Sequence, residues 1–229
     1  MSMNSLDDPY YNCHSKIEEK LKVPGYIPLP KKYFATWNKA KDLLAKLGPK
    51  LGKLNPLYGT AIMAYTIGDS LYSDFNAAVR EGGKSKYAYQ HFAFKDFYFV
   101  FNRALQAKKK KPACYEVFRG IKGVCFTLPS KEVRFGQFAS SSKIKKIAQG
   151  FGEDTFFSIK TCYGVSISPI SLRPYQQEVI IPPYEKFTVI SHNKTLKGVF
   201  IRLVSQGFFS RFNCDNLKDF SFRGNTEKV

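Results

Sequence analysis

No stretch of this 229-residue sequence approaches the roughly 18 consecutive apolar residues of a membrane-spanning helix. The sequence therefore predicts no transmembrane segment. Residues 1–13, MSMNSLDDPYYNC, also lack the apolar core of a secretory signal peptide. Either the protein is intracellular, or a leader has been removed and a methionine supplied. Outside the cytosol, the sequon Asn193-Lys194-Thr195 would be a glycosylation site.

Acidic residues are scarce. The chain has 18 Asp and Glu against 36 Lys and Arg, which gives a formal net charge of +18 and a pI near 9.6. A surface so basic favours anionic partners such as nucleic acid, an acidic membrane, a sulfated glycan or a ligand that carries phosphate. Charge by itself does not choose among these classes of partner.

Cysteine is sparse and widely spaced. No two of the five cysteines are close enough in sequence for a Cys-x-x-Cys pair, so neither a zinc cluster nor a dithiol redox motif is expected. The odd number leaves room for two disulfides and one free thiol. The five are Cys13, Cys114, Cys125, Cys162 and Cys214.

Groups for nucleophilic catalysis are also few. The three histidines, His14, His91 and His192, lie in unrelated contexts, so a serine nucleophile with a histidine base has little support. One carboxylate, Glu178, begins an apolar run without a paired acid, whereas ordinary glycoside hydrolysis usually needs two carboxylates. A lone carboxylate can still stabilise a cationic sugar transition state if it holds a sugar hydroxyl.

The chain is rich in apolar and aromatic side chains. Hydrophobic residues make up 44% of it, with 21 Phe and 14 Tyr, which is enough for a packed core. From residue 114 on, short β-prone runs separated by Gly, Pro and Ser predict strands, with one short helix over 140–152. The two halves together indicate an α+β fold, as one domain or two intimate subdomains. Before residue 114, apolar residues at helical spacing predict helices over 15–22, 34–48, 58–72, 73–81 and 87–111.

Three sites in the strand-rich half place polar groups at strand ends. Arg119 precedes Gly120. The guanidinium can bind phosphate or carboxylate through two parallel hydrogen bonds, and the glycine permits a ligand to approach the backbone closely. Ser140 leads from a strand into a helix, either as an N-cap or as a hydrogen-bond partner of a ligand or catalytic carboxylate. Glu178 stands two residues after Gln176. Each site also has a purely structural interpretation, since an arginine after a strand or an acid at a loop edge is common.

Arg before Gly, Phe-x-Ser-x-Ser, and an acid two residues after Gln form the R-S-E pattern. In this pattern the chain resembles the vertebrate ecto-mono-ADP-ribosyltransferase family. The resemblance extends from Asp7 to Cys214, nearly the whole chain. Segments that match in the expected order are DDPYYNC, GTAIMAYT, SDFNAAVRE, HFAFKDFYFVFNRALQ, CYEVFRG, VRFGQFASSS, FFSIKTCYG, QEVIIPPYEKF and FNC.

The resemblance implies a helical N-terminal part packed on a core of two facing β-sheets, with an NAD cleft between them. Arg119 would hold the pyrophosphate and ribose of NAD, and the Gly120 backbone would bind the nicotinamide amide. Ser140 would contact the nicotinamide ribose and orient Glu178, and Phe151 would pack on nicotinamide. Glu178 would hold the ribose 2′-hydroxyl and stabilise the positive charge that develops as the glycosidic bond lengthens. NAD+ would be the substrate, with no metal and no permanent cofactor.

The same resemblance implies the pairing of the cysteines, the cellular location and the bounds of the catalytic domain. The bridges would be Cys13–Cys214 and Cys114–Cys162, leaving Cys125 free, and Arg173 would assist with the phosphates. Family members are secreted or lipid-anchored at the cell surface. Since this chain has no hydrophobic C-terminal anchor signal, we expect a secreted form or a trimmed ectodomain. One catalytic domain would span 7–214, with a mainly helical part over 7–110, a β-rich NAD-binding core over 114–214, and tails at 1–6 and 215–229.

One position departs from the family pattern. Arginine-specific members carry Glu-x-Glu, whereas this chain has Gln176 in place of the first glutamate. A glutamine can neither take a proton from the acceptor guanidinium nor form a carboxylate–guanidinium pair. We therefore predict that the protein cleaves NAD+ and passes ADP-ribose to water or to a protein, including itself, with only weak transfer to arginine. The alternatives are transfer to a nucleic-acid base or another non-arginine acceptor, and a catalytically silent surface-binding protein.

Overall fold

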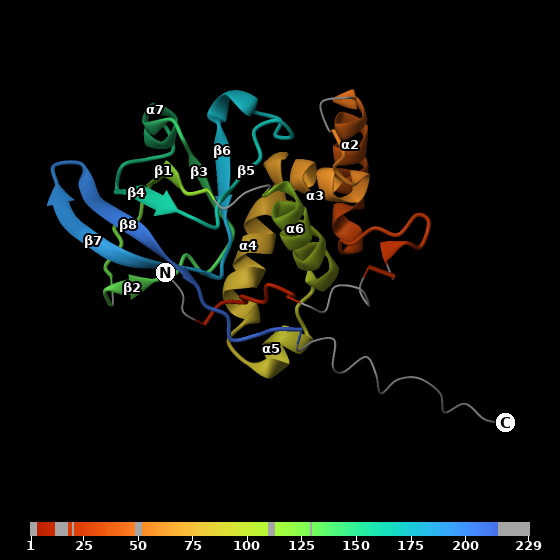
Figure 1. The fold of residues 1–229 in the computed structure, drawn as a ribbon, viewed down its shortest axis with the longest axis horizontal. Coiled ribbons are helices and arrows are strands. Elements are labelled where there is room, and N and C mark those ends of the chain that lie inside the picture. Colours follow the sequence, from red (N-terminus) through yellow and green to blue (C-terminus); the bar gives the residue numbers. More distant parts are fainter. Residues whose placement is uncertain are drawn as a thin grey trace.

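The first half of the chain is helical and the second half is mostly β-strand, as the sequence predicts. The computed structural model describes residues 4–11, 18–19, 21–48, 52–109, 113–128 and 130–214. Figure 1 shows the helices of the first half gathered on one side of the molecule and the strands on the other. The α+β class is thus confirmed.

Polar side chains set the starts of two helices in the first half. The helices described there are η1 (Lys31–Tyr33), α2 (Phe34–Ala45), α3 (Pro56–Thr66), α4 (Ser70–Gly82), α5 (Lys86–Gln90) and α6 (Lys95–Lys108). The Asn55 side chain accepts a hydrogen bond from the Leu57 N–H over 2.9 Å, and Asp69 accepts one from the Leu71 N–H over 2.9 Å. Both satisfy amides that have no partner within their helix, so they fix where α3 and α4 begin. Of the helix expected over 15–22, residues 15–17 and 20 lie outside the described residues.

The segment 87–111, predicted as one helix, contains a break between α5 and α6. Phe92 and Phe94 lie in the break, each 6% exposed, and both belong to the same apolar core. The backbone leaves the helical conformation there, since Phe94, just before α6, has a φ of −108° and a ψ of 27°. The prediction of a single continuous helix is therefore wrong.

The second half consists of short strands with two small helices between them. These elements are β1 (Tyr115–Ile121), β2 (Glu132–Val133), β3 (Ala139–Ser142), α7 (Lys145–Gln149), β4 (Thr155–Thr161), β5 (Val165–Ser166), η3 (Pro174–Gln176), β6 (Glu178–Ile181), β7 (Glu185–Thr195) and β8 (Gly198–Phe208). The strands are hydrogen-bonded in the order β2-β7-β8-β4-β1-β3-β6-β5. The pair β4–β8 is parallel and the other neighbours are antiparallel.

The two groups of strands join at one point. A single register pair, Phe118 with Ser142, links β1 to β3, whereas β1 and β4 pair along all seven residues of β1. The sheet therefore has two parts, a five-stranded part that ends with β1 and a three-stranded part that begins with β3. A single residue pair joins the two parts. On the far side of the junction, Ser142 pairs with Glu178 across β3 and β6. The junction thus brings polar residues from three strands together.

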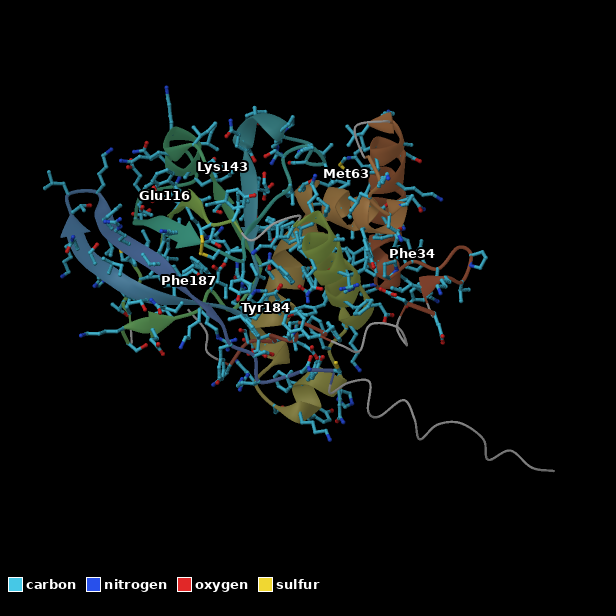
Figure 2. All side chains as sticks on the ribbon, viewed as in Figure 1. Phe34, Met63, Glu116, Lys143, Tyr184 and Phe187 are labelled. Atoms are coloured by element: carbon cyan, nitrogen blue, oxygen red, sulfur yellow. A yellow bond between two sulfur atoms is a disulfide. The ribbon has the colours of Figure 1, made fainter. Side chains whose placement is uncertain are left out.

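Aromatic packing holds the helical half against β3 and β6. Phe138 and Ile180 are fully buried in the same apolar cluster as the helices. The Phe75 ring of α4 stacks on Phe138, with ring centroids 5.6 Å apart. The Tyr184 hydroxyl donates a hydrogen bond to the Asn102 side-chain oxygen over 3.2 Å, and Figure 2 shows Tyr184 where the strands meet the helices. Buried ring pairs of this kind stabilise a core beyond their area alone, so the two halves are fixed relative to one another.

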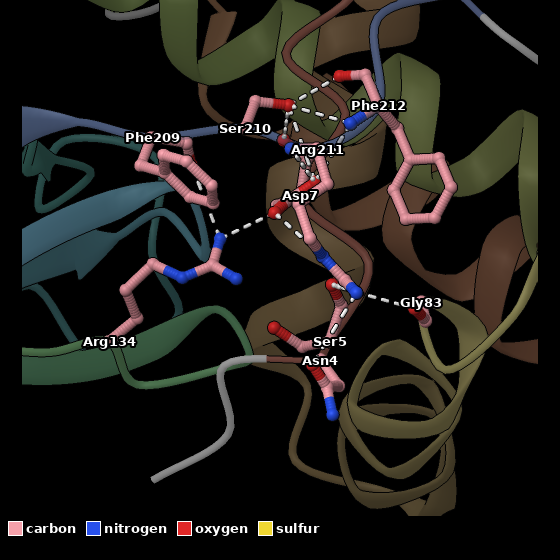
Figure 3. A network of polar contacts seen from close by, with 9 residues as sticks. All are labelled: Asn4, Ser5, Asp7, Gly83, Arg134, Phe209, Ser210, Arg211 and Phe212. Atoms are coloured by element: carbon pink, nitrogen blue, oxygen red, sulfur yellow. Dashed lines mark hydrogen bonds and ion pairs between the residues drawn. The ribbon is translucent and has the colours of Figure 1, made fainter.

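Asp7, among the first described residues, forms a buried ion pair with Arg134, just after β2, and hydrogen bonds with residues near the end of the β-rich half (Figure 3). Arg134 and Asp7 are both fully buried, and the guanidinium donates a hydrogen bond to the carboxylate over 2.5 Å. Asp7 also accepts hydrogen bonds from the Arg211 N–H over 3.0 Å and from the Ser210 hydroxyl over 3.3 Å. A buried carboxylate is tolerated only when it is paired and hydrogen-bonded, and Asp7 meets both conditions.

The structure contains the disulfide Cys114–Cys162, and Cys125 is an exposed free thiol. The bridge Cys13–Cys214 stays a prediction, because Cys13 lies outside the described residues. Over the described ranges, no helix combines the length and the hydropathy needed to cross a membrane.

Candidate active site

A cavity of about 450 Å³ opens where β1, β3 and β6 meet α7 and the C-terminal end of α3. Its size lies within the range of small-molecule sites in proteins. The structure brings together in it every residue that the sequence predicts for NAD binding, catalysis and acceptor choice. They are Arg119, Gly120, Ser140, Phe151, Arg173, Gln176 and Glu178.

Arg119 is held at the junction of β1 and β3. One terminal nitrogen of its guanidinium donates a hydrogen bond to the backbone carbonyl oxygen of Ser140 over 2.5 Å. The side chain is half-buried and lines the cavity. A guanidinium has five N–H donors, so this bond orients the group and leaves others for a phosphate or ribose oxygen.

Ser140 lies within β3 and is not a helix N-cap. The N-cap position of α7 is Ile144, and the Ser142 hydroxyl accepts a hydrogen bond from the Ile144 N–H over 2.9 Å in the turn before it. The Ser140 hydroxyl is buried and makes no hydrogen bond of normal geometry to the described residues. It nevertheless lies close enough to Glu178 to lower the pKa of that carboxyl. An unsatisfied buried hydroxyl beside a carboxylate is a feature of a site prepared for a ligand.

The Glu178 carboxyl has a raised pKa. Burial is the largest cause, because it penalises the charged form. The Ser140 hydroxyl and the guanidinium groups of Arg173 and Arg119 act in the opposite direction, but less strongly. A partly desolvated carboxylate interacts more strongly with a positive charge than a hydrated one does. The position therefore suits a group that stabilises a cation inside the cavity.

The backbone at Gly120 packs tightly against the backbone of α7 and of the loop that follows it. A Cβ atom at this position would lie 2.1 Å from the Ala148 carbonyl oxygen and 2.3 Å from the Gly152 carbonyl oxygen. Any side chain would force α7 and the loop after it away from β1. The glycine is thus required for close approach of the backbone, and the segment that it admits carries Phe151, which also lines the cavity.

The loop before β6 presents Arg173 and Gln176 to the cavity. Gln177 adopts a left-handed conformation with φ of 45°, which turns the chain sharply between η3 and β6. The turn is anchored because the Lys143 N–H donates to the Gln177 carbonyl oxygen over 3.3 Å. The Arg173 guanidinium lies over Gly68, whose added Cβ would be 3.8 Å from it. Gln176 and Glu178 therefore open onto the same space from the two ends of one turn.

A model of one protein family, described as NAD:arginine ADP-ribosyltransferase, matches residues 1–210 of the chain. The chain belongs to this ADP-ribosyltransferase family. The family resemblance expected from the R-S-E pattern is thereby confirmed. It places the chain among enzymes that transfer ADP-ribose from NAD.

Relatives in this ADP-ribosyltransferase family match nearly the whole chain. NAD(P)(+)--arginine ADP-ribosyltransferase 2 of Gallus gallus is 41% identical over 95% of this chain and 72% of its own length. The GPI-linked NAD(P)(+)--arginine ADP-ribosyltransferase 1 of Homo sapiens is 36% identical over 96% of this chain and 74% of its own length. A mutant of the eukaryotic mono-ADP-ribosyltransferase ART2.2 in complex with NAD has the same fold, with a TM-score of 0.79 and 36% identity. That match covers 93% of this chain and 96% of the solved one.

The ADP-ribosyltransferase cavity has a helical wall that the sequence did not reveal. Tyr65, Gly68 and Tyr72, from α3, the α3–α4 turn and α4, line it together with the strand residues. The Tyr65 hydroxyl donates a hydrogen bond to the Phe138 carbonyl oxygen over 3.0 Å and accepts one from Asn76 over 3.0 Å. The sequence predicts one helix over 58–72, whereas α3 ends at Thr66 and α4 begins at Ser70. The predicted helix also did not show which strands this part of the chain would meet.

Proposed function

We propose that this protein cleaves the bond between nicotinamide and ribose in NAD+ and passes ADP-ribose to water or to a protein acceptor, including itself. Transfer to arginine is weak. The observation that carries the proposal is the combination in one cavity of Arg119, Ser140 and Glu178 with Gln176 in place of a second acid. We further propose that residues 7–214 form one catalytic domain.

Binding of NAD+ uses the cationic and aromatic groups of the cavity. Arg119 and Arg173 supply positive charge for the pyrophosphate, as a guanidinium pairs well with phosphate oxygens. Phe151 offers a ring face at the rim of the cavity, 57% exposed, against which nicotinamide packs. The Gly120 backbone lies in the wall beside it.

Cleavage requires that positive charge be stabilised on the ribose. As the bond between the ribose C1′ and the ring nitrogen breaks, both bonding electrons go to nicotinamide, which leaves as a neutral molecule. The ribose becomes an oxocarbenium-like cation. Glu178 accepts a hydrogen bond from the ribose 2′-hydroxyl, and its negative charge stabilises that cation. Ser140 supports the carboxylate, whose pKa its hydroxyl already lowers. Water then bonds to C1′ and loses a proton to solvent.

Gln176 decides how well arginine competes with water. The acceptor nitrogen of arginine is protonated and must lose a proton to attack C1′. A carboxylate can take that proton and pair with the rest of the guanidinium, whereas a neutral amide can do neither. Water needs no such base to be captured by a strongly electrophilic cation. The relatives named as arginine ADP-ribosyltransferases are therefore a guide to the donor, NAD, more than to the acceptor of this chain.

Product analysis with NAD+ tests the proposal. The protein is incubated with NAD+ in the presence and absence of agmatine, an arginine analogue. The products are separated by chromatography and identified by mass spectrometry. We expect nicotinamide in amounts equal to free ADP-ribose plus self-modified protein, and little ADP-ribosyl-agmatine. Abundant ADP-ribosyl-agmatine would contradict the proposed choice of acceptor. The absence of nicotinamide release, with NAD+ still bound, would favour a silent binding protein.

We infer an extracellular location, secreted or at the cell surface. Two observations support it. The disulfide Cys114–Cys162 is typical of proteins that fold in an oxidising compartment. Relatives over more than nine-tenths of the chain carry names that include "GPI-linked" and "Ecto". Recovery of the protein from the medium or the surface of cells that express its gene tests the location.

A further inference from the structure

The tip of the β7–β8 hairpin touches the loop that carries Phe151. We propose that this tip, through Gly198 and Lys197, positions the loop 150–154 and thereby sets the affinity of the protein for NAD+. Gly198 and Lys197 are positioning residues in this view, since they act through Phe151. The inference rests on the proposed function, in which Phe151 packs on nicotinamide.

The loop 150–154 connects α7 to β4 and holds Phe151 at the edge of the cavity. The ring is 57% exposed, so few contacts of its own restrain it. Its position must then come from the backbone on either side. A ring that is to pack on a flat ligand benefits from being held in place before the ligand arrives.

The inner side of the loop rests on the end of β1. The Gly152 backbone packs so closely on β1 that an added Cβ would lie 2.4 Å from the Lys122 nitrogen. The Gly123 N–H donates a hydrogen bond to the Asp154 carboxylate over 2.7 Å. These contacts fix the side of the loop that faces the cavity wall.

The outer side of the loop is covered by the hairpin tip. The Val199 N–H donates a hydrogen bond to the Asp154 carbonyl oxygen over 2.9 Å. Gly198 has a φ of 148° and lies so close that an added Cβ would be 2.4 Å from the same carbonyl oxygen. Lys197 reaches along the loop to the Glu153 carboxylate, with 2.9 Å between Nζ and Oε2. The loop is therefore held between β1 and the tip, two segments far apart in the sequence.

The hairpin tip can hold the loop 150–154 without contributing much to the stability of the whole fold. Thr195, Leu196 and Lys197 are all exposed, so they contribute little to the buried core of the β-rich half. Lys197 is 70% exposed, and a single ion pair of this kind contributes little energy by itself. The close contact of Gly198 is different, because a side chain there cannot be accommodated without moving the backbone of the tip or of the loop. Gly198 should consequently have the larger effect.

Steady-state kinetics of nicotinamide release test the proposal. Gly198→Ala should raise KM for NAD+ about fivefold or more through displacement of the loop, with kcat changed less. Lys197→Glu should raise KM about twofold, and the charge reversal Lys197→Glu with Glu153→Lys should restore it. Lys194→Ala, an exposed lysine on the same hairpin, is the matched control and should leave KM unchanged. Thermal unfolding of each variant separates loss of fold from loss of affinity, and Lys197→Glu serves if Gly198→Ala fails to fold.

A double-mutant cycle shows whether the effect passes through the ring. In a Phe151→Ala background, Gly198→Ala should raise KM much less than it does in the parent protein. Equal KM values for the parent protein, Gly198→Ala and Lys197→Glu would overturn the proposal. So would a rise in KM from Gly198→Ala that is as large in the Phe151→Ala background as in the parent protein. If the parent protein releases no nicotinamide, the proposed function fails by itself. The hairpin proposal is then decided by the Kd of NAD+ for the same variants.

Discussion

The Ser142 hydroxyl donates a hydrogen bond to the backbone carbonyl oxygen of Gln176 over 2.6 Å. Ser142 ends β3, and Gln176 belongs to the turn before β6, so the bond joins the turn directly to the junction of the sheet. The backbone of Gln176 is thus held independently of its side chain. A substitution at this position changes the group that faces the cavity without releasing the turn.

Gln176→Glu should increase transfer of ADP-ribose to agmatine on the order of 100-fold, the effect of adding a general base. The new carboxylate would stand at the same point of the cavity as the amide, since Ser142 still holds the backbone. Chromatography of ADP-ribosyl-agmatine formed per nicotinamide released measures the change. Gln177→Glu is the matched control, because it adds the same charge one residue away on an exposed side chain. An equal gain from both substitutions would contradict a specific role of position 176.

Glu178→Gln should reduce nicotinamide release by about 100-fold or more, since it removes the charge that stabilises the ribose cation. The same substitution should stabilise the fold. The folded-state pKa of Glu178 is raised above the ordinary value of 4.5, chiefly by burial, so its ionisation costs folding free energy. This cost is absent below pH 4.5, grows between pH 4.5 and the folded-state pKa, and is complete above it. The Tm of Glu178→Gln should exceed that of the parent protein at pH 7, and the difference should vanish near pH 4. A lower Tm at pH 7 would contradict this reasoning.

The acid limb of the pH profile should shift when a cation beside Glu178 is removed. Arg173 lowers the pKa of Glu178, so Arg173→Ala should raise that pKa further. The carboxylate then becomes protonated at a higher pH, and the midpoint of the acid limb of kcat/KM, which reports the free enzyme, should move upward. Arg202→Ala, an exposed arginine on β8, is the control and should leave the midpoint in place. An unshifted acid-limb midpoint with Arg173→Ala would mean that this limb does not report the ionisation of Glu178.

The buried pair Arg134–Asp7 should be essential for stability. Arg134→Met leaves the buried Asp7 carboxylate with only the more distant Arg211 guanidinium, 4.0 Å away, and should lower the free energy of unfolding by about 3–5 kcal/mol. Urea denaturation measures the loss. The control Lys186→Met breaks the solvent-facing pair with Glu132 (3.0 Å) and should change the midpoint little. A similar, small effect of both substitutions would show that the buried pair contributes no more than an exposed one.

Asn193 should carry an N-linked glycan when the protein is expressed through the secretory pathway. The sequon is exposed near the tip of the β7–β8 hairpin, and Asn193 pairs in register with Phe200 on β8. The first sugar would lie over that half-buried ring. Intact mass before and after treatment with a peptide N-glycosidase measures the glycan, and Asn193→Gln should abolish the difference. A secreted protein without a mass change would contradict the prediction.

Much of the candidate site was predictable from the sequence. Arg119, Ser140 and Glu178 occur in short motifs whose order along the chain carries the family resemblance, and the structure brings them into one cavity. Of the two interpretations of Ser140, the helix cap is excluded, because Ser140 lies in β3 and pairs with Ile180 of β6. One local prediction was wrong. Phe92 and Phe94 are compatible with a helix by length and composition, but the chain leaves the helical conformation between α5 and α6.

The sequence by itself determined the α+β class, the polar residues of the strand-rich half and the neutral amide at Gln176, because periodicity and motif order are local properties of the chain. Only the tertiary structure decided which distant segments meet. The helix end with Tyr65 becomes a cavity wall because aromatic packing presses α3 and α4 against β3. The hairpin tip at Gly198 meets the Phe151 loop because β8 pairs with β4 in parallel. Such contacts depend on strand order and side-chain packing over the whole fold, and no local pattern encodes them.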